Sequence, residues 1–597
     1  MMSERGSWAD PAAEEQLRGA VSLDEPWRYI ERCSELTRFS GSPEERVAFD
    51  HLAERLGAWG VQHTLHLPEV FISWPVAARV TLEAPGEPVR TFAAKTPAMS
   101  VSTGGEVVTG PAAHLPSRYA RGADDLFASG LSEISGGEVA GRVVVTEGLP
   151  MPAKVADLQR LGAVAAVFIS PGERIHEGIC TTIWGSPDLD TDERQPTIPV
   201  AEVIRPDGEA LLAAVAAGEA RLGVATELDT RWRPIPVLVA EIPGTEEPER
   251  FVLLHGHVDS WHVGIGDNAT GNATLLELAR LFAQEGHRPR RSLRIAWWSG
   301  HSHGRYAGST WYADTFALEL AEGCAAQLNC DSPGCRWAST FNDLETTEET
   351  WPLAEAAIQD ASGIAAEWGR PARAGDYSFM NLGISAAFML SSTMPDDLRA
   401  KKGYYAVGGC GGNIAWHTED DTLEIADRDN LLRDIRVYAT AASRLLNAPV
   451  LPLDFRRTAA GIAETLATYQ SAAGERFRFD AARAALAELD MALGQLADAA
   501  VEAAGGDDAD RLARVNGTLV GLSRLLVPIN YARDGRFRQD PAADVPPLPD
   551  LAPALTLPDL TPGSHRDHLT RLSLLRGQNR LVWALRQATE VAAAAAM

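Results

Sequence analysis

The chain has 597 residues, which is too long for one hydrophobic core, so we expect about three domains. An apolar content of 45% and a charged content of 23% are those of an ordinary globular protein, whereas a formal net charge of -27 and a pI near 5.0 argue against nucleic acid and anionic membranes as partners. The polar first residues, the lack of an apolar run of about 18 residues and the unpaired spacing of the six cysteines predict a reducing, cytoplasmic setting.

Residues 24–103 open a globular region. Ser42, followed by a proline and two glutamates, is typical of a helix start, and an apolar stripe at helical spacing runs from Val47 to Trp59. Two strands are predicted to follow, at about 62–67 and 78–83.

Residues 104–231 differ in composition and predict a compact α/β unit. Its expected elements are a strand at 143–146, a helix at 153–162, strands at 163–169 and 198–204, and a helix at 207–217. The loop 176–193, which holds Trp184 and several acidic residues, is the candidate lid, and we assign it no role in the chemistry.

From residue 251 to residue 331, strands and helices alternate. Buried strands are predicted at 251–254, 293–298 and 325–329, with helices between them at 270–285 and up to about Gly323. This alternation predicts a parallel sheet with right-handed connections, and in such sheets the chemistry gathers beyond the carboxyl ends of the strands. The polar residues expected there are His257, Asp259, Asp267, His301, His303 and Asp331.

Four of the polar residues predict a metal site. His257, Asp267 and Asp331 combine imidazole and carboxylate, which suit zinc and similar divalent ions, and His417 lies in a polar turn with a supporting carboxylate at Asp421. Each residue alone could be ordinary turn chemistry, but the four together favour a divalent metal, with zinc expected as one or two ions.

These motifs resemble the co-catalytic zinc peptidase family of the bacterial leucyl aminopeptidases, and most closely its glutamate carboxypeptidase II and transferrin receptor branch. By this resemblance the metal ligands are His257, Asp267, Asp331 and His417. By the same resemblance, Asp259 is the carboxylate that orients His257. The motif Asp259-Ser260-Trp261 matches the carboxypeptidase branch, and the resemblance implies a cis peptide bond between Asp267 and Asn268.

The resemblance also implies the fold class and the domains. We expect an α/β fold with a mixed, mainly parallel sheet flanked by helices, made of a peptidase-like domain in two segments, 24–103 and 232–450. Residues 104–231 would form a protease-associated-like insert over the site, although a generic α/β insertion fits the pattern equally well. Residues 451–597 would form a helical dimerisation-like domain and make the protein a homodimer.

The loop 300–309 departs from the family pattern. It reads GHSHGRYAGS, one residue longer than the family's motif and without its two glutamates, which serve as general base and metal ligand. Aligned from the left, His301 replaces the base and Ser302 the ligand; aligned from the right, Ser302 replaces the base and His303 the ligand. Because imidazole can fill either role and a serine hydroxyl neither, at least one of the two histidines is expected to face the metal and act in catalysis. The third alternative is that the site has lost hydrolysis.

A wall for the substrate is expected between Asp331 and His417. The loop 375–379 resembles a loop of the family, and 401–416 is rich in glycine and aromatic residues. A basic residue that reaches the pocket, among Arg305, Arg373, Lys401 and Lys402, would favour a substrate carboxylate. The predicted substrate-binding residues are Arg305, Tyr306, Asp376, Tyr377 and Trp416.

Beyond residue 451 the sequence predicts long helices, at 455–503, 508–527 and 565–595, with a proline-rich break at 541–562. They resemble the dimerisation domain of the transferrin receptor branch; the alternative is a bundle that packs only on its own peptidase domain.

The function that follows is metal-assisted hydrolysis of an amide bond in a short peptide, an N-acyl amino acid or another small C–N compound. The alternatives are a catalytically silent binding or scaffold protein, and an enzyme that uses iron, manganese or nickel for non-peptide chemistry.

Overall fold

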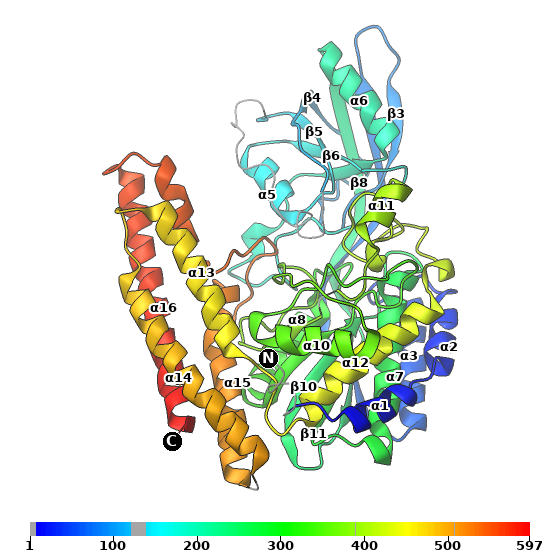
Figure 1. Ribbon diagram of the computed structural model, residues 1–597. Helices are drawn as coiled ribbons and strands as arrows, with labels where there is room; N and C mark the ends of the chain where they lie inside the picture. Colours follow the sequence, from blue (N-terminus) through cyan, green and yellow to red (C-terminus); the bar gives the residue numbers. More distant parts are fainter. Residues whose placement is uncertain (1–7, 121–138, 389, 507, 597) are drawn as a thin grey trace.

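The computed structural model describes residues 8–120, 139–388, 390–506 and 508–596 (Figure 1). Part of the predicted insert, at 121–138, and the first seven residues of the polar amino-terminal segment lie outside these ranges.

The first sheet has six strands, of which the central ones are parallel. β10 pairs in parallel with both β11 and β12, and β12 pairs in parallel with β13, whereas β9 and β1 are antiparallel at one edge. The prediction of a mixed, mainly parallel sheet is therefore confirmed. In spatial order the strands are β1 (Gln62–His66), β9 (Val237–Ile242), β11 (Arg291–Trp298), β10 (Glu247–His257), β12 (Cys324–Asn329) and β13 (Ala386–Ala387).

Both faces of this sheet are buried, which explains why its strands are continuous apolar runs. Because successive side chains point to opposite faces, Trp297 packs into one core and Trp298 into the other. The first core lies under α2 (Asp24–Cys33), α3 (Pro43–Ala58), α7 (Thr270–Ala283), α10 (Trp351–Ser362) and α12 (Arg428–Asn447), and the second under α8 (Ala307–Thr315) and α9 (Ala317–Gly323).

Two details differ from the prediction for this domain. The single helix expected up to Gly323 is two helices, α8 and α9, which meet at Phe316. An additional helix, α1 (Pro11–Gly19), precedes residue 24 and joins the same core through Leu17, and Glu14 on it pairs with Arg444 of α12 at 2.9 Å.

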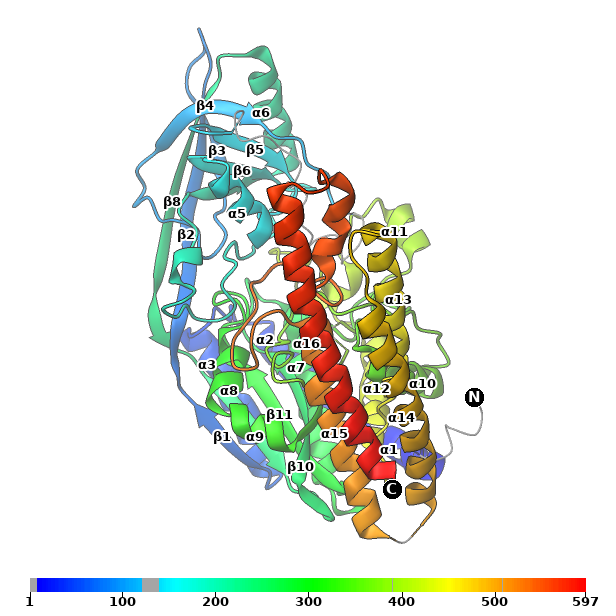
Figure 2. The same cartoon turned by 90° about the vertical axis from the view of Figure 1, so that its left-hand side faces the viewer.

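The second sheet has seven strands among the described residues and is built around two long ones. β2 and β8 pair antiparallel from Glu69 opposite Pro234 to Glu83 opposite Arg221, and Figure 2 shows them running from the first sheet up into the insert. This sheet therefore begins well before residue 104, and the domain division itself stays a proposal. In spatial order its strands are β3 (Arg90–Ala94), β2 (Glu69–Glu83), β8 (Arg221–Pro234), β4 (Val108–His114), β5 (Val143–Glu147), β6 (Ala165–Ile169) and β7 (Val200–Val203), accompanied by the helices α5 (Pro152–Arg160) and α6 (Arg205–Ala217).

The carboxyl-terminal helices form a bundle beside the first sheet (Figure 1). The helix expected at 455–503 is divided at Gly474, whose φ of +56° is left-handed. The guanidinium of Arg524 ties the bundle to the sheet domain by donating to the carbonyls of Leu320, Ala321, Cys324 and Gly383. The helices are α13 (Phe455–Ala473), α14 (Asp480–Gly505), α15 (Ala509–Tyr531) and α16 (His565–Ala596). Within the described residues, no helix has both the length and the apolar character needed to cross a membrane.

Candidate metal centre

The predicted metal-binding residues lie at the carboxyl ends of neighbouring parallel strands. His257 ends β10, His301 follows β11 and Asp331 follows β12. Asp267 lies in the turn before α7, and the peptide bond that follows it is cis, as the resemblance implied. Adjacent strands of a parallel sheet end at one edge, so these side chains come together although they are far apart in the sequence.

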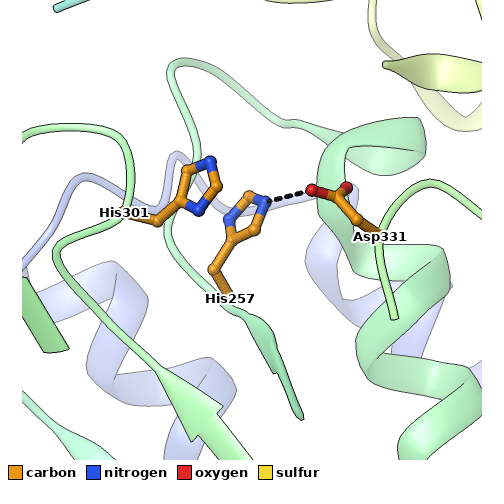
Figure 3. A group of neighbouring side chains, drawn as sticks. All are labelled: His257, His301 and Asp331. Atoms are coloured by element: carbon orange, nitrogen blue, oxygen red, sulfur yellow. Dashed lines mark ion pairs between the residues drawn. The ribbon is translucent and has the colours of Figure 1, made fainter. Parts of the chain in front are cut away.

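The distances define a compact cluster. His257 Nε2 lies 3.0 Å from Asp267 Oδ1 and 3.6 Å from Asp331 Oδ2, and His417 Nε2 lies 3.0 Å from Asp267 Oδ2. The two carboxylate oxygens of Asp267 therefore face two different histidines. His257, His301 and Asp331 each also offer one donor atom, and these three atoms lie within 4.8 Å of one another (Figure 3).

The directions of the donor atoms fit a divalent cation. His257 Nε2 and Asp267 Oδ1 are both buried, and although they are 3.0 Å apart neither makes a hydrogen bond with a described residue. Buried polar atoms are otherwise nearly always hydrogen-bonded, so two that lack a partner and converge are arranged as ligands are. Imidazole nitrogen and carboxylate oxygen are the donors that zinc accepts.

The charges of the cluster depend on one another. Burial disfavours a charged imidazole, but the adjacent carboxylates of Asp267 and Asp331 outweigh it and raise the pKa of His257 well above its usual value. Burial likewise disfavours ionisation of Asp267, but His257 and His417 outweigh it and hold the pKa of Asp267 well below its usual value. Asp267 is therefore an ionised carboxylate between two histidines.

Asp259 supports the cluster in a different way from the one predicted. The Nδ1 of His257 is 2.9 Å from the backbone carbonyl of Asp259, whereas the nearest carboxylate oxygen is 3.8 Å away. The carboxylate instead accepts hydrogen bonds from the backbone N–H groups of His301 and Ser302 and from the hydroxyl of Ser40. The carbonyl of Asp259 thus orients His257, and its carboxylate fixes the loop that carries His301.

Asp421 holds the loop that presents Asp267. Its two carboxylate oxygens accept hydrogen bonds from the backbone N–H groups of Gly266, at 2.7 Å, and of Asp267, at 3.0 Å. Burial raises the pKa of Asp421 to about 6, partly against these hydrogen bonds. Asp421 thus contacts the backbone beside Asp267, and its supporting role stays a prediction.

The structure separates the two histidines that the sequence left open. The His301 ring stacks on His257, with ring centres 3.7 Å apart and planes 13° apart, and its Nδ1 is 2.8 Å from Asp376 Oδ2. The His303 ring instead lies between Phe39 and Trp261, with Nδ1 3.0 Å from the hydroxyl of Ser40. His303 therefore does not join the cluster as the predicted ligand or catalytic group. Its side chain packs against Phe39 and Trp261 instead.

Asp376 and Tyr377, both predicted to bind substrate, have other contacts. Asp376 is buried and accepts hydrogen bonds from His301 and, at 2.6 Å, from the hydroxyl of Ser309. Burial would raise its pKa, but the neighbouring His301 outweighs that effect and lowers it, so Asp376 is an ionised partner of His301. Tyr377 is buried in a cluster with Val527 and Tyr531 and does not line the cavity.

The remaining three predicted residues line a cavity of about 80 Å³ in front of the cluster. Arg305, Tyr306 and Trp416 share its wall with His301 and Asp331. Arg373, Lys401 and Lys402 do not line it. Its apolar lining residues include Leu149, Met151, Ile179 and Trp261.

Sequence reasoning missed the part played by the predicted lid. His417 Nδ1 is 2.6 Å from the backbone carbonyl of Glu177, and His176 Nδ1 is 2.6 Å from the backbone carbonyl of Trp416. The loop after β6 thus orients a predicted metal ligand from outside the first sheet. Its single histidine, His176, and its several acidic residues were the only signal in the sequence.

Comparisons with known proteins agree with this geometry. Residues 238–442 match the family model described as peptidase family M28. The chain is 27% identical over 344 residues to a probable glutamate carboxypeptidase, VP8, of Zea mays, an alignment that covers 49% of this chain and 48% of the maize protein. It is 35% identical over 105 residues to transferrin receptor protein 1 of Gallus gallus, covering 17% of this chain and 13% of the receptor.

The chain thus spans about half, or less, of the length of these curated relatives. Its fold is shared with an aminopeptidase from Aneurinibacillus sp. strain AM-1, with a TM-score of 0.53 and 18% identity over 73% of this chain and 96% of the other. The family match over residues 238–442, the curated relatives and the common fold show that this chain is similar to peptidase family M28.

Proposed function

We propose that the protein is a metal-dependent hydrolase that cleaves an amide bond in a short peptide or an N-acyl amino acid. The observation that carries this proposal is the cluster of His257, Asp267, Asp331 and His417. Asp267, Asp331 and His417 of this cluster line one cavity together with His301. The curated relatives named as carboxypeptidases and the solved zinc aminopeptidase from Bacillus subtilis favour the same reaction class and zinc as the metal.

Within this proposal, His257, Asp267 and Asp331 hold the ion. The second oxygen of Asp267 and His417 offer a neighbouring position with these two ligands. A bound divalent ion supplies an acidified water and polarises the substrate carbonyl. We therefore favour a centre with one firmly held ion and a weaker second position.

His301 takes the role of proton carrier in place of the missing glutamate. Because its Nδ1 donates to the ionised Asp376, its Nε2 is left as the lone-pair nitrogen. It can accept a proton as the attacking water is deprotonated and return it to the nitrogen of the departing amine. Asp376 keeps the imidazole in this tautomer.

Metal analysis combined with an activity screen tests the proposal. We expect the purified protein to contain zinc and to hydrolyse at least one member of a panel of dipeptides and N-acyl amino acids. His257→Ala should lose both metal and activity, and His301→Ala should lose activity with most of the metal retained. His565→Ala, at an exposed histidine on α16, is the matched control.

Two outcomes would overturn the proposal in different ways. A protein that contains no metal, and whose variants behave like the wild type, would be a binding or scaffold protein. A protein that contains iron, manganese or nickel and cleaves no amide would be a metalloenzyme of another chemistry.

We also propose a homodimer, with the insert acting as a protease-associated-like domain, in the cytoplasm. The exposed leucines 569, 572 and 575 and Trp583 on α16 support a further contact of the helical bundle, and six free, buried cysteines suit a reducing compartment. Light scattering after size-exclusion chromatography measures the oligomeric state, and a monomeric mass would contradict the dimer.

A further inference from the structure

Arg305 is a buried cation for which the described residues provide no anion. Its side chain lines the cavity of the metal centre, and the residue is only 5% exposed. Its guanidinium makes neither a hydrogen bond nor an ion pair with any part of the chain that the structure describes, and its Nε is buried without a partner. Burying a charge costs several kcal/mol unless it is paired, so this position is built for a negative group that arrives with a ligand.

Aromatic rings fix the surroundings of this guanidinium. Arg305 lies over the ring of Tyr306, at 5.1 Å from its centre, and the Tyr306 ring packs at a tilt of 39° against Trp184 of the predicted lid, with ring centres 4.3 Å apart. Arg373 lies over the Trp184 ring, at 3.7 Å from its centre, and donates hydrogen bonds to backbone carbonyls and to Gln539. Two arginines and two rings thus form a layered wall without a carboxylate among the described contacts of either guanidinium.

The backbone places Arg305 in this wall at an energetic cost. Both Arg305 and Tyr306 have left-handed backbone angles, with φ of +49° and +68°, which is uncommon for residues other than glycine. Strain of this kind persists where the surrounding structure enforces it, and it is concentrated at functional sites. The left-handed turn separates Arg305 by only four positions from His301, so the cation and the imidazole enter the same cavity from one loop.

We propose that the Arg305 guanidinium binds a carboxylate of the substrate. A planar guanidinium matches the two oxygens of a carboxylate, and the apolar wall of Leu149, Ile179 and Trp261 suits an apolar group beside it. The inference deepens the proposed function by narrowing the substrate to amides that carry a free carboxylate. Its binding step, however, can be tested without any turnover.

The experiment compares two probes that contain no amide bond, benzoate and benzyl alcohol. Their dissociation constants for the metal-loaded protein are measured by isothermal titration calorimetry. We expect benzoate to bind about 10-fold or more tightly than benzyl alcohol in the wild type, and Arg305→Gln to lose that preference. Arg305→Lys should retain part of it, since the charge remains while the paired hydrogen bonds are lost. Arg231→Gln, at an exposed arginine of β8, is the control and should behave like the wild type.

Each other result overturns the inference. If Arg305→Gln still prefers benzoate, the carboxylate binds to the metal alone. If the wild type shows no preference, or benzoate shows no saturable binding, Arg305 is not a carboxylate site. Circular dichroism of the folded variants separates loss of binding from loss of structure, and Arg305→Lys keeps the test informative if Arg305→Gln does not fold. The preference can hold even if no amide is cleaved, so failure of the proposed hydrolysis is distinguishable from failure of this inference.

Discussion

Replacing Asp376 by asparagine tests whether His301 acts as the proton carrier. The two side chains are joined by a 2.8 Å contact between His301 Nδ1 and Asp376 Oδ2, and both lie within the protein next to His257. Asparagine keeps the shape of the side chain but removes its charge. It can also donate to Nδ1, which would place the imidazole proton on Nε2, the nitrogen that must accept a proton from water.

The size of the effect follows from this contact. A hydrogen bond to a charged partner contributes about 1.5–3 kcal/mol, which corresponds to roughly 10- to 150-fold in rate. Loss of a general base altogether costs about 100- to 10,000-fold, which sets the upper limit. We therefore expect kcat of Asp376→Asn to fall by roughly 10- to 150-fold, with KM and the metal content nearly unchanged.

The assay is steady-state hydrolysis of the substrate found by the screen, with metal content measured on the same samples. Ser309→Ala is the matched control, because it removes the 2.6 Å hydrogen bond to Asp376 while the charge remains, and its kcat should fall much less. An unchanged kcat in Asp376→Asn would refute the role of His301 as proton carrier. A fall in kcat that only parallels a loss of metal would show instead that Asp376 supports a ligand.

Four further results are expected. Burial lowers the pKa of His176 to about 4 in the folded protein, so below about pH 6.5 the unfolded chain binds the proton more readily. The free energy of unfolding should therefore fall by roughly 3 kcal/mol at most from pH 6.5 toward pH 4. Denaturant titrations should show a flatter pH profile for His176→Gln than for the wild type. In Gly308→Ala the new Cβ would lie 2.2 Å from the carbonyl oxygen of Ser299, so the melting temperature should drop by an amount that reflects about 1–3 kcal/mol or more. The control is Gly494→Ala, whose new Cβ would lie in open space, and it should be neutral or stabilising. Arg524→Met leaves four carbonyl oxygens without their donor and should cost about 3 kcal/mol or more in urea unfolding; a loss below about 1 kcal/mol would contradict the anchoring role. Removal of metal by a chelator should lower the melting temperature, and added zinc should restore it, as differential scanning fluorimetry can show.

The sheet and the edge that carries the cluster could be predicted because they depend on local patterns. The apolar runs at 251–254 and 293–298 are short, buried and followed by polar residues, and a parallel arrangement brings such strand ends together whatever the intervening loops do. The meeting of His257, Asp267 and Asp331 follows from that topology.

The direction of each side chain in the 300–309 loop could not be predicted in the same way. His301 and His303 are two residues apart in an irregular turn, so their orientation depends on distant partners. The carboxylate of Asp259 holds the backbone of His301, and Ser40 and Phe39 receive His303. The spacing of these residues along the sequence predicts none of these contacts.

Long-range pairing also explains the other differences between the predictions and the structure. β2 extends to Glu69 because it pairs with β8, about 150 residues later, and the local sequence indicated only the part from residue 78 onward. The predicted lid orients His417 through the backbone carbonyl of Glu177. Because every residue type has a backbone carbonyl, the sequence gives no signal for this contact.

The backbone carbonyl of Glu177 couples two parts of the structure, the loop after β6 and the metal cluster at the edge of the first sheet. Since His417 is oriented by a carbonyl of the loop after β6, excising residues 104–231, which we propose to be an insert, or replacing them with those of a relative, would misalign the imidazole even if every residue of the first sheet were kept. Mutations in the insert should accordingly register as altered zinc occupancy, and the two parts are expected to have diverged together rather than by independent exchange.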